Sequence, residues 1–539
     1  MLCSHRKRSE GNPRVKVELA ILILYTIGIV GIGLWASRGV KTSCDYLLAG
    51  RRLGLWVLVG TLTMTELNTM SLVGFSGYGY RAGIYATMIP LMFVLTFLFY
   101  MVVYAKRWKR FNATTTSEFF EARFASRGLS RTASVLWLVG LILIVPNYMT
   151  GAAVILKIAF NLSFEWSVIL ICGTVFIFTL IGGLKAVAYT DYASMFLALG
   201  TFPVIFYYSF KNGGGWKSLT ETFATINPAY NHWNGFNMIG DPVLDFKMVL
   251  GWIFACFWVF QMAQWYGQKM FAAKNEQTAY WSMGITAALV YLMYASTILV
   301  AAFVRVKNPN LTDVEKEPPL AWAVMNFMEN PIWRGLMLAN IFAVCQTTVS
   351  SVWNSMVSLV TQDIYKGWLR PNATDQQLLK ESRWLTVIFA VWTMFGAIFL
   401  IQRFTGIVRG TAIANAFMFI PTIPCLLGFI WRGYHRRAAI LTMIVAAVPA
   451  ITIVSYKGIY KGEQFFFDVF ILTALVTIAM GVLFAWLGKS DVAEEKAREQ
   501  FFRKVGDPYF RSGQPRVFRG AQEMVLSSTV PNTEAAKGS

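Results

Sequence analysis

The chain has 539 residues, of which 56% are hydrophobic and only 14% are charged. Soluble proteins carry about 25% charged residues, so this composition excludes an ordinary soluble protein of several domains. The net charge of +20 does not indicate nucleic-acid binding, because the basic residues fall in short connections between long apolar runs.

The apolar runs are about 18 residues long or longer and recur along almost the whole chain, which is typical of an integral membrane protein with many transmembrane helices. We predict an all-α protein embedded in the lipid bilayer, with about thirteen spans. The first is a membrane anchor, because no small-residue cleavage pattern follows it. The predicted spans lie near residues 17–37, 53–80, 82–106, 132–160, 164–184, 189–210, 248–271, 279–305, 333–362, 384–403, 407–432, 438–455 and 466–488.

The distribution of basic residues between the spans predicts the orientation, because cytoplasmic loops are enriched in Lys and Arg. With the N-terminal segment 1–16 outside and the polar tail 489–539 in the cytoplasm, three basic sets fall on the cytoplasmic side. They are Lys106, Arg107, Lys109, Arg110, Arg123, Arg127 and Arg131; Lys366, Arg370, Lys380 and Arg383; and Arg436 and Arg437. The tail should open with a surface helix over "DVAEEKAREQFFRKV". The long outside loops 211–247 and 306–332 should form short helices or lids.

The second predicted span contains an unusual polar stretch, "TLTMTELNTMSLVGFSGYGY", at residues 61–80. Small residues here favour close helix packing. Packing does not account for Glu66, because a carboxylate at membrane depth costs about 3 kcal/mol or more and normally faces a cavity with a partner. The acid, with Asn68 and the threonines at 65 and 69, indicates a helix broken near its middle, whose freed carbonyl groups bind a cation or a solute.

A second polar stretch, "IFAVCQTTVSSVWNSMVSLVTQDIY", occupies residues 341–365. Five polar residues recur there at helical spacings of three and four and form one stripe: Thr347, Ser351, Asn354, Ser355 and Ser358. The stripe is either a binding surface or a set of hydroxyl groups that bond back to their own helix.

A third stretch, "LIGGLKAVAYTDYASMF" at residues 180–196, brings Asp191 to the cytoplasmic start of a span. This acid is either a ligand or a helix-start residue favoured by the helix dipole. Hydroxyl, carbonyl and carboxylate oxygen atoms are the ligands that a hard cation such as sodium prefers.

The ordered motifs "DYLLAGRRLGLW", "GFSGYGYRAG", "GGLKAVAYTD", "QWYGQKMFAAKN" and "SVWNSMVSLVTQDIY" resemble the sodium:solute symporter family over roughly residues 17–490. The resemblance implies the leucine-transporter-like fold, which consists of two inverted repeats of five helices. The first repeat would cover 53–210 and the second 248–432. One extra helix (17–37) would precede them, and two helices (438–488) would follow.

The resemblance also implies sodium sites. The first would use the carbonyl groups of Met64, Leu67 and Val344 and the hydroxyl groups of Thr347 and Thr348. A second site would use Asp191, Ser350 and Ser351 together with Thr347. Ser194 departs from the usual "TDxxQ" pattern, so the family glutamine is missing here.

For the solute, the family positions favour an amine, an amino acid or another polar solute over a sugar. The polar positions of the sugar-transporting branch are here Ser71, Pro90 and Cys256, and its tyrosine gate is Val259, whereas Glu66 matches an acidic position of the proline-transporting branch. The expected solute-binding residues are Glu66, Asn68, Thr69, Ser71, Cys256, Trp258, Phe260 and Gln264.

Together these features predict a symporter in the plasma membrane that imports a small organic solute with Na+ by alternating access. A proton-coupled carrier, with Glu66 or Asp191 titrating, and a non-transporting sensor are the alternatives. The absence of a GxxxxGK[ST] loop argues against ATP-driven transport, and no nucleophile–base pair indicates an enzyme.

Overall fold

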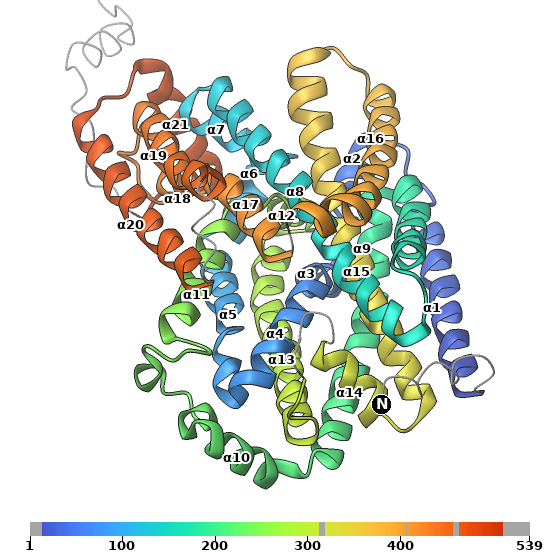
Figure 1. Cartoon of the computed structure of the whole chain (residues 1–539). Helices are drawn as coiled ribbons and strands as arrows, with labels where there is room; N and C mark the ends of the chain where they lie inside the picture. The colour runs from blue at the N-terminus through green and yellow to red at the C-terminus, as the bar shows by residue number, and fades with distance from the viewer. Residues whose placement is uncertain (1–12, 312–317, 406, 456–462, 510–539) are drawn as a thin grey trace, which may run out of the picture.

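In the computed structural model, the described residues 13–311, 318–405, 407–455 and 463–509 form a bundle of helices (Figure 1). No β-sheet occurs among them, and an isolated bridge pairs Leu53 with Ala273. The helices of the first half are α1 (Pro13–Ser37), α2 (Ser43–Leu48), η1 (Ala49–Arg51), α3 (Leu55–Glu66), α4 (Thr69–Ala82), η2 (Gly83–Met88), α5 (Leu91–Tyr100), η3 (Met101–Ala105), α6 (Lys106–Phe111), α7 (Glu118–Phe124), α8 (Arg127–Phe160) and α9 (Phe164–Asn212).

The second half continues with short helices and then long ones. They are α10 (Gly215–Ile226), η4 (Pro228–Asn231), η5 (Gly235–Met238), α11 (Phe246–Phe260), α12 (Gln264–Ala272), α13 (Glu276–Lys307), α14 (Pro319–Phe327), α15 (Pro331–Ser358), η6 (Leu359–Leu369), α16 (Asp375–Phe395), η7 (Gly396–Thr405), α17 (Ile407–Phe419), α18 (Thr422–Ile430), α19 (Arg436–Ser455), α20 (Glu463–Leu487) and α21 (Val492–Val505).

The long apolar helices agree with the predicted membrane architecture. Eight helices of the described residues are long and apolar enough to cross a membrane, and the pair α11 and α12, bent by 51° at its break, would make a ninth. Each predicted span falls on a helical segment, but the total of thirteen stays a prediction, because helices such as α3 are short by themselves.

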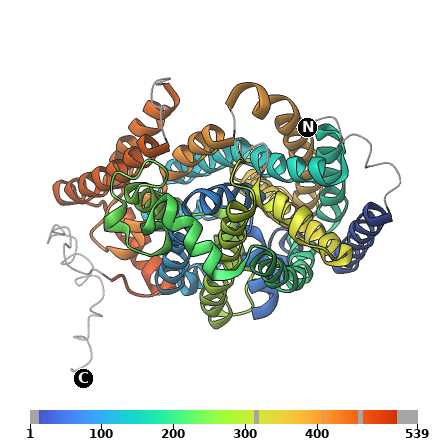
Figure 2. The same ribbon diagram turned by 60° about the horizontal axis from the view of Figure 1, so that its bottom comes forward.

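Both long loops contain short helices, as expected. α10, η4 and η5 lie in the first loop and α14 in the second, and α10 runs across the end of the bundle opposite to α21 (Figures 1 and 2). α3 and α15 pack against each other at the centre of the bundle, and both also pack against α9.

Two predicted spans, 164–184 and 189–210, join without a loop in α9. The chain turns at Gly183, whose φ of 53° and ψ of −143° are unfavourable for residues with a side chain. A Cβ atom at this position would collide with the carbonyl oxygen of Tyr46 in α2. Glycine therefore permits both the turn and the close approach of α2.

We expect Gly183→Ala to lower the thermal stability of the purified protein. A strained backbone conformation costs about 1–3 kcal/mol, and the collision with Tyr46 adds to this cost. Gly173→Ala is the matched control in the same helix, because a Cβ atom there meets no neighbour within 4 Å. Equal melting temperatures for the two variants in detergent would contradict this account of the turn.

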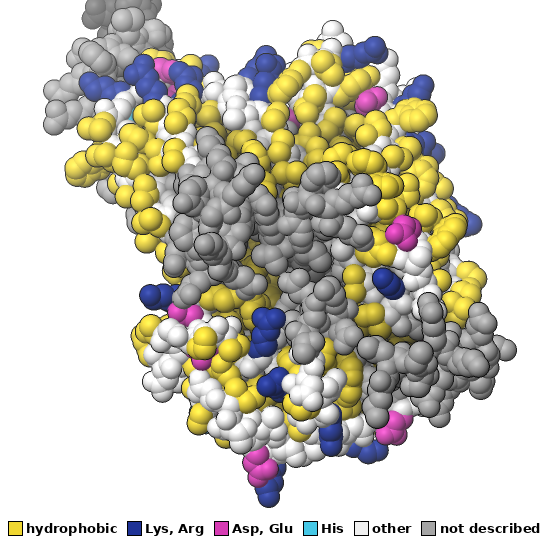
Figure 3. Space-filling model, viewed as in Figure 1, with side chains coloured by type: hydrophobic (Ala, Val, Ile, Leu, Met, Phe, Trp, Pro, Cys, Tyr) yellow, Lys and Arg dark blue, Asp and Glu magenta, His cyan; other side chains and the backbone are white. Residues whose placement is uncertain are grey.

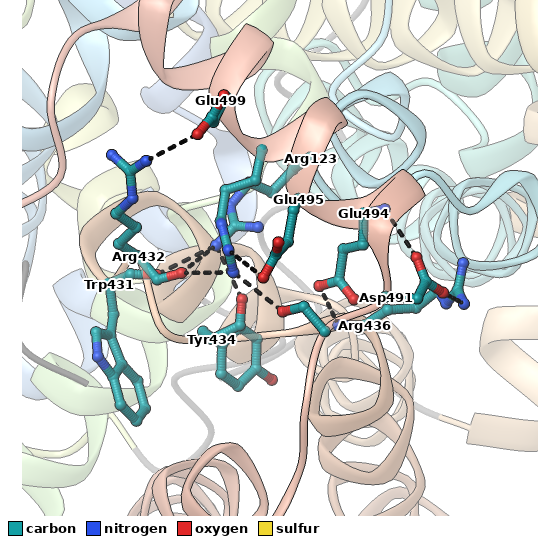
Figure 4. A network of polar contacts seen from close by, with 11 residues as sticks. Arg123, Trp431, Arg432, Tyr434, Arg436, Asp491, Glu494, Glu495 and Glu499 are labelled. Atoms are coloured by element: carbon teal, nitrogen blue, oxygen red, sulfur yellow. Dashed lines mark hydrogen bonds and ion pairs between the residues drawn. The ribbon is translucent and has the colours of Figure 1, made fainter. Parts of the chain in front are cut away.

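The C-terminal helix α21, predicted as a surface helix, packs against α6 and α7. Figure 4 shows the polar contacts around it. Arg123 of α7 is fully buried. Its guanidinium group donates to the carbonyl group of Gly428 in α18 (3.0 Å) and to that of Tyr434 between α18 and α19 (2.8 Å). Glu494 of α21 accepts from the Arg436 N–H at 2.6 Å. Burial raises the pKa of the Glu494 carboxyl group, whereas the nearby guanidinium groups oppose that shift.

Candidate functional site

The helix break predicted within residues 61–80 is present. α3 ends at Glu66 and α4 begins at Thr69, with extended backbone at Leu67 and Asn68 between them. Asn68 caps the second helix, because its side-chain oxygen accepts from the Ser71 N–H at 2.7 Å. Its amide group also donates to the Glu66 carbonyl at 3.1 Å. The asparagine therefore stabilises both ends of the break.

Tyr294 of α13 satisfies two more backbone groups at the break. Its hydroxyl group donates to the Glu66 carbonyl at 2.6 Å and accepts from the Asn68 N–H at 3.2 Å. A backbone group without a partner at membrane depth costs several kcal/mol. Tyr294 therefore lowers the free-energy cost of the helix break inside the bundle.

Hydroxyl groups of α15 bond to the other carbonyl groups that the break frees. The Thr347 hydroxyl donates to the Met64 carbonyl at 2.8 Å, and the Thr348 hydroxyl is 3.0 Å from the Leu67 carbonyl. Both hydroxyl oxygens are also 3.0 Å from the Val344 carbonyl. All five residues expected at the first sodium site therefore converge at one point.

These five oxygen atoms are uncharged and suit a hard cation. Rotation of the two hydroxyl groups away from the carbonyl oxygens would turn their lone pairs toward an ion held between α3 and α15. Without a carboxylate, such a site would hold the ion more weakly than a site that contains one.

The residues expected at the second sodium site make different contacts. Asp191 of α9 accepts a hydrogen bond from the Thr61 hydroxyl of α3 at 2.6 Å. Ser351 of α15 lies 2.6 Å from the Thr65 hydroxyl. Asp191 and Ser351 are therefore both connected to α3. Among the described residues, neither Ser350 nor Ser351 has a hydrogen bond to Asp191.

Much of the polar stripe on α15 bonds back to its own helix. The side chains of Ser350, Asn354, Ser355 and Ser358 each donate to a carbonyl group three or four residues earlier, at 2.9–3.0 Å. The back-bonding interpretation is therefore correct for Asn354, Ser355 and Ser358 of the stripe and also describes Ser350 beside it. Thr347 of the stripe and its neighbour Thr348 also reach the broken helix.

A lysine that the sequence analysis did not assign lies beside these groups. Lys269 of α12 is only 1% exposed, and its ammonium group donates to the Thr61 carbonyl at 2.9 Å and to the Thr65 hydroxyl. The residue falls two positions before the predicted end of a span, where a lysine usually extends to the membrane surface. The position of Lys269 in the sequence therefore did not indicate that its side chain is buried.

A cavity of about 50 Å³ adjoins the helix break. Five of the expected solute-binding residues line it: Glu66, Asn68, Ser71, Cys256 and Phe260. This volume holds about one or two water molecules. The helices around it must therefore move apart before an organic solute can enter.

Three other expected solute-binding residues lie outside this lining and contact other parts of the protein. The Thr69 hydroxyl donates to the Tyr148 carbonyl at 2.6 Å. The Trp258 ring packs on Phe257, with ring centroids 4.9 Å apart. Gln264 accepts from the Thr116 N–H at 2.8 Å and thereby fixes the chain before α7. None of the three lines the cavity.

Several residues that line the cavity were not predicted. They include Tyr148 of α8, Trp252 of α11 and Asn415 of α17. One feature of the sequence does indicate part of this lining. Trp252, Cys256 and Phe260 are spaced by four residues and therefore lie on one face of α11.

Glu66 is the acid among the residues that line this cavity. It is 5% exposed, and the Tyr266 hydroxyl of α12 donates to its carboxylate. The site therefore combines one buried carboxylate with aromatic rings and a small number of neutral polar groups.

A broken helix packed against a hydroxyl-rich helix is the arrangement that the resemblance in motifs led us to expect, and known families of proteins provide an independent comparison. The model of the Sodium:solute symporter family matches residues 46–446, which is well over half of the chain. The chain belongs to the sodium:solute symporter family. It is accordingly a sodium-coupled membrane transporter and not an enzyme.

Curated relatives of this symporter carry different solutes. It is 23% identical to the sodium/glucose cotransporter of Vibrio parahaemolyticus, over 86% of this chain and 89% of that protein. It is 25% identical to the sodium/proline symporter of Salmonella typhimurium, over 92% and 97%. The sodium/myo-inositol cotransporter 2 of Sus scrofa is 22% identical, over 82% and 70%.

Solved structures confirm the expected leucine-transporter-like fold. A Na+-coupled sialic acid symporter, in a substrate-bound outward-open state, superposes on the symporter with a TM-score of 0.74 at 19% identity, over 88% of this chain and 98% of that one. MhsT in complex with L-phenylalanine gives a TM-score of 0.52 at 12% identity, over 80% and 99%. At such low identity these structures establish the fold and leave the solute undetermined.

Proposed function

We propose that this symporter imports a small organic solute bearing an amine, with sodium bound at the first site, by alternating access in the plasma membrane. The contact of Thr348 with the Leu67 carbonyl supports this proposal most directly. Thr348 also lines the cavity beside Glu66. One residue is therefore common to the ion site and the solute cavity.

This shared position gives a physical basis for coupling. An ion between Met64, Leu67 and the α15 hydroxyl groups would hold the broken helix against α15, and this helix pair forms one wall of the cavity. Sodium binding would thereby order the solute site before the solute arrives. Each sodium ion gains about 2.3 kcal/mol from a membrane potential of 100 mV, which drives accumulation.

The chemistry of the cavity favours an amine over a sugar. A sugar needs many hydrogen-bonding partners, whereas aromatic and aliphatic side chains form most of this lining: Met92, Phe93, Ile144, Tyr148, Trp252, Phe260, Trp265 and Val352. An ammonium group would pair with the Glu66 carboxylate and attract the faces of neighbouring rings.

The proposed orientation places the C-terminus in the cytoplasm and the N-terminus outside. Arg107 donates to the Asp507 carbonyl at 2.8 Å, and Arg436 pairs with Asp491, so the predicted cytoplasmic loops lie beside the tail. Lys and Arg side chains gather along the top of Figure 3, at the end where α21 and α7 lie in Figure 1. A positively charged face is expected on the cytoplasmic side.

The first test is a thermal-shift screen in sodium buffer, followed by uptake into proteoliposomes. Solutes with an amine should raise the melting temperature, and sugars should not. Replacement of external sodium by choline should lower uptake of the selected solute about tenfold or more at every pH. Uptake that follows the pH gradient and ignores sodium would support a proton-coupled carrier. Binding without any uptake would support a sensor.

A further inference from the structure

Lys269 is a fully buried lysine at the centre of the bundle, and none of the roles described above requires it. It lies on α12, after the break that separates this helix from α11. A charged side chain at membrane depth normally has a partner and a function.

The partners of Lys269 are oxygen atoms of two helices. Its ammonium group donates to the Thr61 carbonyl at 2.9 Å, to the Thr65 hydroxyl, and to the Ser351 hydroxyl at 3.3 Å. The three N–H groups of an ammonium ion therefore match three acceptors on α3 and α15. Ser351 is also one of the residues expected at the second sodium site.

Asp191 supplies the opposite charge. Its carboxylate accepts from the hydroxyl group of Thr61, whose carbonyl group accepts from Lys269. Asp191 is completely buried, and its other carboxylate oxygen has no hydrogen-bond partner in the described parts of the chain. Asp191 and Lys269 therefore bond to the same residue, Thr61, and their opposite charges would attract each other across it.

A sodium ion beside Asp191 and Ser351 would therefore meet a cation that is already in place. It would compete for the Ser351 hydroxyl, and the two positive charges would repel each other in a water-poor environment. The second site would thus have to hold a monovalent cation next to the Lys269 ammonium group, which shares the Ser351 hydroxyl group and the Asp191 charge with it, and this arrangement does not suit an additional ion.

From this arrangement we propose that the Lys269 ammonium group is a tethered cation, which replaces the second sodium ion and leaves one transported sodium ion per cycle. The inference rests on the proposed function, because it takes the first site as the sodium site. A tethered cation organises α3, α9 and α15 as an ion would. It gains no energy from the sodium gradient, because it never leaves the protein.

The test is a count of bound ²²Na+ per purified full-length chain, with sodium itself as the probe. The wild-type chain should bind one ion, and Asp191→Asn should still bind one with unchanged affinity. Lys269→Met should bind two, because it frees the oxygen atoms and the Asp191 charge. Lys274→Met is the matched control, since Lys274 belongs to the same motif but is exposed, and it should bind one.

Two outcomes for Asp191→Asn would overturn the proposal. In the first, the wild-type chain binds two ions and Asp191→Asn binds one. In the second, the wild-type chain binds one ion and Asp191→Asn binds none. A folded Lys269→Met variant that binds one ion would also count against it. If either single variant fails to fold, Asp191→Asn combined with Lys269→Met removes both charges, and it should fold and bind one ion. A wild-type chain that binds no sodium would instead contradict the first site, and with it the proposed function.

Discussion

Replacement of both Thr347 and Thr348 by alanine is expected to raise the dissociation constant for sodium about a hundredfold or more. The change removes two of the five oxygen atoms that converge at the first site and leaves the carbonyl groups of Met64, Leu67 and Val344. Contacts between polar groups and a charge contribute about 1.5–3 kcal/mol each, and every 1.4 kcal/mol is a factor of about ten in affinity. ²²Na+ binding to the purified protein measures the effect.

Two controls separate ion binding from stability. Thr347→Ser with Thr348→Ser retains both hydroxyl groups and should keep the sodium affinity within about tenfold of wild type. Thr297→Ala removes a buried hydroxyl group of α13 that bonds to the Met293 carbonyl of its own helix, and it should leave sodium binding unchanged. Wild-type affinity in the alanine double variant would show that sodium binds elsewhere.

Glu66→Gln is expected to lower the apparent affinity for an amine solute about a hundredfold, with little change in sodium affinity. Removal of one partner from a buried ion pair costs about 3–5 kcal/mol, because the other charge is left without compensation. Sodium at the first site should be spared, since the Glu66 side chain bonds to Tyr266 and lies in the cavity lining. Uptake and ²²Na+ binding measured on the same preparation give the two values.

Tyr266→Phe is the companion variant, because it keeps the ring and removes the hydroxyl group that bonds to Glu66. It should have a smaller effect on solute affinity than Glu66→Gln. A parallel loss of sodium and solute affinity in Glu66→Gln would assign the carboxylate to the ion. Unchanged solute affinity would mean that the transported solute makes no contact with this acid.

The break in the second span was predictable because its cause is local. An acid and an asparagine in an apolar run are costly in lipid, and a break with a polar cavity removes that cost. The structure shows how Asn68 caps α4 from within this stretch. By contrast, the contribution of Tyr294 comes from a helix more than two hundred residues away, and no local pattern points to it.

The solute cavity was only partly predictable, because its lining depends on which face of each helix turns inward. The spacing of Trp252, Cys256 and Phe260 indicates one common face of α11, and Trp258 falls on another face. Helical periodicity alone does not say which face meets the broken helix. For α11 that depends on its packing partners, chiefly α20 and α5.

Composition and residue order were enough to predict the membrane environment and the interrupted span, and the ordered motifs added the family and the residues proposed for the first ion site. The first two properties follow from the cost of polar groups in lipid, which acts on each short stretch separately. Only the tertiary structure revealed where Lys269 lies and that it contacts Thr61, Thr65 and Ser351. The same is true of the connection of two predicted spans within α9. Such features depend on the packing of distant helices, because a buried charge is stable only where other helices supply its partners.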